Sequence, residues 1–209
     1  MATYTPTRPP LESGDHLTRE EFHRRYCERP DIRKAELVEG IVYVASPVSV
    51  NHARPDNVIN GWLLVYKARM PGVEALADVT VYPDDENEVQ PDALLMRVDP
   101  PGSARIRDDG YVEGPPELVV EIAASSASYD LHSKRRVYES AGVPEYLVWV
   151  VYERRVVWLR LQDGRYVEVA PDANGVIESA VFPGLRLAVD KLLAGDDAAV
   201  LAALETPRS

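Results

Sequence analysis

Apolar residues recur along the chain in two rhythms, and each rhythm predicts a type of secondary structure. Spacings of three and four residues predict an amphipathic helix over residues 55–70, with Pro55 in its first turn. A capping box at Thr18–Glu21 predicts a second helix as far as about Tyr26. A third helix is predicted from a cap at Ser128 or Asp130 to the breakers Gly142 and Pro144.

Short apolar runs bounded by turn residues predict strands. Two hairpins are expected, one turning at Glu39-Gly40 and one at Asp163-Gly164. Other strands are predicted within residues 73–83, 93–96, 118–122 and 146–151, and a final strand and short helix within residues 177–193. We therefore expect a tail over residues 1–15, one domain over residues 16–195 and an acidic, alanine-rich tail over residues 196–209.

The charge balance restricts the classes of partner. Lys and Arg number 23 against 34 Asp and Glu, a net charge of −11, which argues against the broad basic surface of a sequence-independent nucleic-acid binder. The single cysteine, Cys27, forms no internal disulfide and is typical of a reducing cytoplasm, where we expect the protein to reside. No apolar run approaches the roughly 18 residues of a membrane span, so no membrane association is expected.

Two apolar runs carry a carboxylate that their pattern does not require. Asp92 precedes the run Ala93–Met96, and Glu121 lies within the run Leu118–Ile122. A buried ionised carboxylate is costly unless it is paired, protonated or bound to a metal. Lys134 is the candidate partner, because it lies three residues after Leu131 and four before Tyr138, on the apolar face of its helix. Two carboxylates and an inward lysine suit a metal-dependent phosphodiesterase that uses Mg²⁺ or Mn²⁺.

Other polar residues have two open interpretations each. Glu36 in the first hairpin is either a solvated edge residue, the more frequent case, or a third acid near the metal. His52 is either a surface or capping group or part of a cleft. The loop between the two acidic strands belongs to the kind that often contacts substrate, and its arginines are either solvated or bind phosphate: Arg97, Arg105 and Arg107.

Several motifs occur in an order that resembles a known family. They are A-E-L-V-E-G, V-Q-P-D, P-P-E-L-V-V-E-I, D-L-H-S-K-R-R-V-Y, A-G-V-P-E-Y and F-P-G-L-R-L. Over about residues 17–193 the chain resembles the Uma-two family of endonucleases, also called domain of unknown function 820, a bacterial branch of the PD-(D/E)XK restriction-endonuclease-like superfamily. The resemblance implies an α/β (α+β) fold with a central mixed sheet flanked by helices, an N-terminal helix and a hairpin.

The resemblance also implies roles for individual residues. Asp92 takes the place of the first superfamily acid and Glu121 that of the second, with Mg²⁺ or a similar ion as cofactor. Ala123 stands where the superfamily lysine is usual, so Lys134 is its replacement. Glu36 and His52 match an acid and a histidine that family members carry. Ala124-Ser125 replaces the family's serine-proline pair after the second acid.

Two hypotheses of function follow. The first is a metal-dependent endonuclease that hydrolyses nucleic acid, expected to be DNA, and acts as a homodimer because double-strand cutting requires two sites. The alternative is a catalytically inactive module that keeps the nuclease fold for partner binding or assembly, favoured by the acidic charge and by Ala123. A serine hydrolase or a nucleotide-binding enzyme is disfavoured, since neither a G-x-S-x-G motif nor a phosphate-binding glycine motif occurs.

Overall fold

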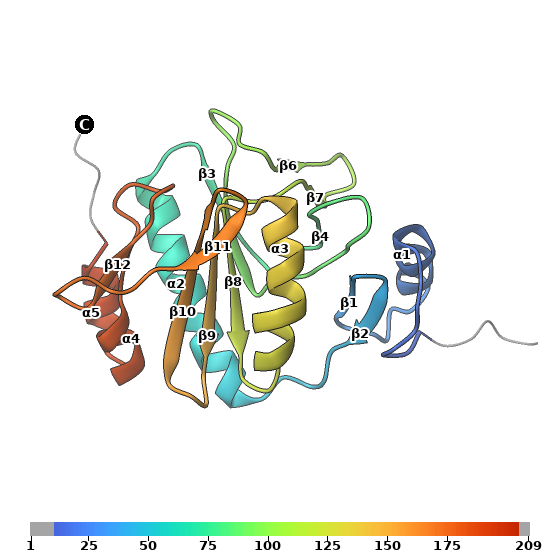
Figure 1. The fold of residues 1–209 in the computed structure, drawn as a ribbon, viewed down its shortest axis with the longest axis horizontal. Helices are drawn as coiled ribbons and strands as arrows, with labels where there is room; N and C mark the ends of the chain where they lie inside the picture. The colour runs from blue at the N-terminus through green and yellow to red at the C-terminus, as the bar shows by residue number, and fades with distance from the viewer. Residues whose placement is uncertain (1–10, 205–209) are drawn as a thin grey trace, which may run out of the picture.

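A six-stranded mixed sheet forms the centre of the computed structural model, which describes residues 11–204 (Figure 1). Its strand order is β11-β10-β9-β8-β5-β3, and only the β8–β9 pair is parallel. The strands are β3 (Val73–Ala77), β5 (Ala93–Arg97), β8 (Leu118–Ala123), β9 (Glu145–Val150), β10 (Arg155–Gln162) and β11 (Arg165–Glu168). The parallel pair requires a crossover, which a helical segment supplies.

Helices cover both faces of this sheet (Figure 1). One face packs against α2 (Val50–Arg69), α4 (Val189–Ala194), α5 (Asp197–Ala202) and the hairpin of β12 (Val176–Glu178) and β13 (Arg186–Ala188). The other face packs against the crossover segment, in which a wide π-helical turn, η1 (Tyr129–Lys134), continues into α3 (Arg135–Ala141). The central strands β5, β8 and β9 are therefore buried on both sides, as their near-continuous apolar runs require.

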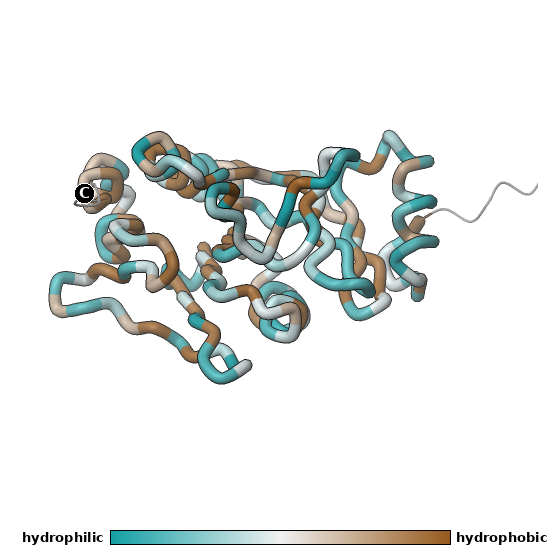
Figure 2. The backbone as a smooth tube through the Cα atoms, turned by 90° about the horizontal axis from the view of Figure 1, so that it is seen from above, coloured by the Kyte–Doolittle hydropathy of each residue, from teal (hydrophilic) through white to brown (hydrophobic). Residues whose placement is uncertain are grey.

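The N-terminal elements lie at one end of the long axis, and the C-terminal helices lie at the other (Figures 1 and 2). α1 (Arg19–Cys27) is capped by Thr18 and packs on the hairpin of β1 (Ala35–Val38) and β2 (Ile41–Val44) in a separate apolar cluster. Beside this hairpin lies a small three-stranded sheet, which consists of β4 (Val81–Tyr82), β6 (Arg105–Ile106) and β7 (Val112–Glu113).

The alternation of side chains along β8 sets the direction of Glu121. Leu118 and Val120 belong to the cluster on the α2 side, whereas Val119 and Ala123 belong to the cluster on the α3 side. Because side chains alternate with a period of two, Glu121 faces the α3 side with these last two. β5 is the antiparallel neighbour of β8. The two strands that carry the predicted acids are therefore adjacent, as expected.

Three features differ from the sequence-based expectation. α2 begins at Val50, so Pro55 lies inside it rather than in its first turn. The strand predicted within residues 73–83 divides at Asp78, which has a left-handed φ of 49° and separates β3 from β4. The loop between the acidic strands contains β6 and β7. Gly142, in contrast, ends α3 in the left-handed conformation as predicted.

Both predicted tails are partly folded. Leu11 is buried against the N-terminal cluster, and Gly14 N–H donates to the Val42 carbonyl, so the domain begins before residue 16. Within the predicted C-terminal tail, α5 buries Val200 and the residue Leu204 follows it into the core. Residues 1–10 and 205–209 lie outside the described residues. Among the helices described, none combines the length and the apolar character that crossing a membrane requires.

Candidate active site

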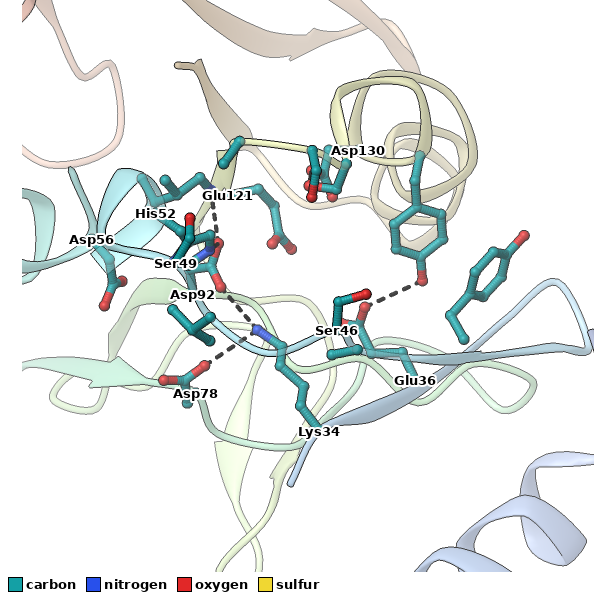
Figure 3. A pocket seen from close by; sticks show the side chains of 18 of the residues that line it. Lys34, Glu36, Ser46, Ser49, His52, Asp56, Asp78, Asp92, Glu121 and Asp130 are labelled. Atoms are coloured by element: carbon teal, nitrogen blue, oxygen red, sulfur yellow. Dashed lines mark hydrogen bonds and ion pairs between the residues drawn. The ribbon is translucent and has the colours of Figure 1, made fainter. Parts of the chain in front are cut away.

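A pocket of about 410 Å³ opens where the N-terminal hairpin, the start of α2, the end of β8 and η1 meet (Figure 3). Carboxylates from separate elements line it together with two lysines, Lys34 and Lys134, and with His52. The acids are Glu36, Asp56, Asp78, Asp92, Glu121 and Asp130. The fold thus concentrates charged groups that the sequence distributes over residues 34–134.

Asp92 lies directly before β5 and is only 5% exposed. Its Oδ2 accepts the Ile122 backbone N–H at 2.7 Å, which holds the carboxylate against the end of β8 beside Glu121. Its Oδ1 accepts from Lys34 Nζ at 2.8 Å, and His52 Nε2 lies 3.3 Å from Oδ2. Three groups therefore stabilise the ionised form of Asp92.

Lys134 is buried and lies between two glutamates. Its Nζ is 2.7 Å from Oε1 of Glu121 and 2.7 Å from Oε1 of Glu36. Tyr138 donates to Glu121 at 3.0 Å, and Tyr129 donates to Glu36 at 3.2 Å. The inward direction predicted for Lys134 is therefore what the structure has, whereas the solvated interpretation of Glu36 is wrong, because Glu36 is 6% exposed.

The pKa of Asp92 is lowered. Burial raises it, but the hydrogen bond with His52 and the ammonium groups of Lys34 and Lys134 outweigh burial. The same hydrogen bond raises the pKa of His52, against the opposing effect of burial. Burial lowers the pKa of Lys34, but the attraction of Asp92 and of the other pocket carboxylates together outweighs burial and raises it. Asp92 therefore stays ionised and surrounded by positive charge.

The pKa values of the deeper groups are shifted by burial and by crowding of negative charge. Burial raises the pKa of Glu121, and Asp92 and Asp130 raise it further against the attraction of Lys134. Burial lowers the pKa of Lys134, but Glu121 and Glu36 reverse this and raise it well above its usual range. Burial also raises the pKa of Asp130 to about 6. Lys134 is consequently a permanent cation at the base of the pocket.

The carboxylates of Asp92 and Glu121 fit a hard divalent ion such as Mg²⁺. Mg²⁺ is usually bound by one or two carboxylates with water and substrate phosphate, rather than by a cage of protein ligands. Asp92 and Glu121 supply two such carboxylates, and each is already paired with a lysine ammonium. Lys34 Nζ lies 2.8 Å from Asp92, and Lys134 Nζ lies 2.7 Å from Glu121. Within residues 11–204 no three His, Cys, Asp or Glu residues are grouped to hold a metal. The residues thus fit a two-carboxylate site and not a closed cage.

The structure brings together five of the predicted site residues and leaves three elsewhere. Asp92, Glu121, Lys134, Glu36 and His52 all line the pocket. The arginines are not among its lining residues: Arg97 ends β5, while Arg105 and Arg107 form ion pairs with Glu113 and Asp109.

Sequence reasoning missed Lys34, Asp78 and the burial of Asp130. A signal existed for Lys34, because a residue two positions before Glu36 in an extended segment shares its side. Asp130 lies four residues before Lys134, on the same helical face, but its position near the start of the helix favoured a capping role. Ser126 instead donates to its carboxylate at 2.5 Å.

The mixed sheet, its flanking helices and the N-terminal hairpin define a restriction-endonuclease-like domain. A crystal structure of a putative nuclease belonging to DUF820 from Anabaena variabilis has the same fold, with a TM-score of 0.63 and 13% identity over 82% of this chain and 96% of that one. The Uma2 family, described as "Putative restriction endonuclease", matches residues 19–190. The chain therefore belongs to the Uma2 family, as its motifs indicated. No curated protein matches it.

Proposed function

We propose that the protein is a metal-dependent endonuclease that hydrolyses phosphodiester bonds of nucleic acid, with DNA as the substrate. The observation that supports this most directly is the meeting of Asp92, Glu121 and Lys134 in one pocket. Asp92 and Glu121 would hold Mg²⁺ or Mn²⁺, which supplies Lewis-acid polarisation of phosphate and water when bound. Membership of a family described as restriction endonucleases adds to this argument.

The residues of the chain have distinct parts in this proposal. Asp92 is kept ionised by His52 and Lys34, so it keeps the negative charge with which a carboxylate binds a cation. Lys134 balances Glu36 and Glu121 and fixes the orientation of the second acid. Its buried charge stabilises negative charge that develops on a phosphate in the pocket. The proposal does not depend on Arg97, Arg105 or Arg107, which lie outside the pocket lining.

The test is cleavage of supercoiled plasmid by the purified protein with Mg²⁺, with Mn²⁺ and with a chelator. We expect nicking or cutting only with metal, and a loss of about a hundredfold or more in Asp92→Asn and Glu121→Gln. Glu168→Gln is the matched control, because Glu168 is an exposed carboxylate on β11. Activity that persists in chelator, or in both site variants, would contradict the proposal. A parallel assay with RNA and single-stranded DNA tests the choice of substrate.

A second candidate is a non-catalytic nuclease-fold module. The observation in its favour is that lysines already neutralise the two acids, through contacts of 2.8 Å and 2.7 Å. Calorimetry separates the two candidates: a folded protein that binds neither metal at millimolar concentration is the module. For the endonuclease we propose a homodimer with two pockets, and sedimentation with and without DNA measures this.

A further inference from the structure

The two lysines that line the pocket differ in their exposure to solvent. Lys134 is 2% exposed and its ammonium contacts Glu36 and Glu121 at 2.7 Å each. The side chain of Lys34 is 23% exposed, and its ammonium reaches into the pocket from the segment before β1 (Figure 3). Lys34 is therefore the lysine that a molecule entering the pocket meets first.

Lys34 bridges a buried carboxylate, Asp92, and an exposed one, Asp78. Its Nζ lies 2.8 Å from Oδ1 of Asp92 and 3.2 Å from Oδ1 of Asp78 (Figure 3). The Asp92 side chain is 7% exposed, whereas that of Asp78 is 63% exposed. Because the ammonium already contacts both carboxylates, it can release Asp92 and stay within the pocket, held by Asp78.

A cation at Asp92 and the ammonium of Lys34 compete for the same oxygen. Two positive charges that share one carboxylate oxygen repel each other at close range, and burial around Asp92 increases this repulsion. A divalent ion bound at Oδ1 of Asp92 would therefore displace Lys34. Asp78 is the acceptor within reach, and its exposed carboxylate stays hydrated while it holds the ammonium.

The displaced ammonium of Lys34 is placed to bind a phosphate group in the pocket. The chain has a net charge of −11, so its affinity for a polyanion depends on positively charged side chains near the binding site. The basic residues that line the pocket are Lys34, His52 and Lys134, and Lys134 is fixed at its base. The ammonium of Lys34 has three N–H donors, so after it leaves Asp92 it still has donors for phosphate oxygens.

We propose that Lys34 is the phosphate-binding residue of this pocket: it occupies Asp92 in the metal-free protein, moves to Asp78 when a divalent cation binds, and then donates to a phosphate oxygen of the substrate. This inference rests on the proposed nuclease function. It assigns to Lys34 two effects of opposite sign, because the same ammonium opposes metal binding and promotes cleavage. A purely structural lysine would give no such opposition.

The test measures both effects in the same variants. Mn²⁺ affinity is determined by calorimetry, and plasmid cleavage is measured at saturating Mn²⁺. Lys34→Met removes the competing charge, so we expect Mn²⁺ affinity to rise about tenfold and cleavage to fall about a hundredfold. Asp78→Asn removes the alternative acceptor, so we expect Mn²⁺ affinity to fall several-fold. Lys67→Met, which breaks the Lys67–Glu74 pair outside the pocket lining, is the matched control.

Distinct results identify which claim fails. Unchanged or weaker Mn²⁺ affinity in a folded Lys34→Met variant overturns this inference, and so does wild-type cleavage by that variant. Lys34→Arg keeps the charge and should keep the Mn²⁺ affinity within about threefold, so an affinity gain in Lys34→Arg also overturns it. If wild-type protein neither binds Mn²⁺ nor cuts DNA, the proposed function itself fails. Circular dichroism on every variant verifies that the fold is intact.

Discussion

Lys134 places its ammonium nitrogen 2.7 Å from Oε1 of Glu36, although the two residues come from the η1 turn and from β1. Glu121 on β8 accepts from the same nitrogen at 2.7 Å. The three side chains are almost completely buried, so the N-terminal hairpin, the sheet and the crossover helix are joined by one ion cluster. This cluster connects the stability of the fold to the shape of the pocket.

Lys134→Met should destabilise the protein by about 3–5 kcal/mol. The substitution keeps most of the side-chain volume but leaves Glu36 and Glu121 buried without their cation. The free energy of unfolding from urea denaturation measures the effect. Lys67→Met is the control, because Lys67 pairs with Glu74 at a partly exposed position, where an ion pair contributes about 0–1 kcal/mol. Equal losses in the two variants would contradict the burial argument.

Tyr138→Phe should cost more than Tyr146→Phe. Tyr138 donates to the Glu121 carboxylate at 3.0 Å, whereas Tyr146 donates to the neutral Asp130 carbonyl at 2.9 Å. Both rings are buried, so the two variants differ mainly in the acceptor. A hydrogen bond to a charged group contributes about 1.5–3 kcal/mol and a neutral one about 1 kcal/mol. Urea denaturation of both variants compares them, and equal costs would indicate that Glu121 is neutral in the folded state.

The sequence was informative where local spacing determines the outcome. Asp92 and Glu121 interrupt apolar runs, and the spacing of Lys134 from Tyr138 gives its side of the helix. The hairpin turns at Glu39-Gly40 and Asp163-Gly164 have left-handed conformations, which glycine and aspartate favour. In each case the physical cause lies within a few residues of the feature, so a sequence pattern is sufficient to predict it.

Prediction failed where burial depends on distant segments. Every residue of β1 is buried, including Glu36, because α1 and η1 cover the strand from other parts of the chain. The π-helical turn also has no signature in the apolar spacing, and it widens the helix where Asp130 and Lys134 face the pocket. Lys34 was missed for the same reason, since its partners Asp78 and Asp92 are brought to it by the fold.

Val200→Ala should destabilise the protein by about 2 kcal/mol. Val200 in α5 is fully buried in the core on the α2 side of the sheet, although its segment is acidic, rich in alanine and was predicted to be a tail. Removing two buried methyl groups costs their transfer free energy plus that of the cavity. Val167→Ala is the matched control, because Val167 is 45% exposed and its truncation should change stability by less than about 0.5 kcal/mol. Similar losses in both variants would mean that α5 is detached in solution.

The stabilisation from Glu21 should disappear in acid. Hydrogen bonds from Arg24 and Arg25 lower the pKa of Glu21 from 4.5 to about 2. A carboxyl with a lowered pKa in the folded state stabilises it above the unfolded pKa, and this contribution is lost as pH falls towards the folded value. The difference in thermal midpoint between wild type and Glu21→Gln should therefore be constant above about pH 5 and should decline between about pH 4.5 and pH 2.

Glutamine is the suitable replacement at position 21 because it removes the charge at nearly constant size, while the backbone N–H of residue 21 still donates to Thr18 Oγ1. Glu20→Gln is the control, since Glu20 is an exposed carboxylate in the same first turn of α1. Glu21 is close to the protein surface, so added salt should reduce the difference as well. A difference that grows on acidification would reverse the sign of the linkage and would show that the Arg24 and Arg25 contacts do not form in solution.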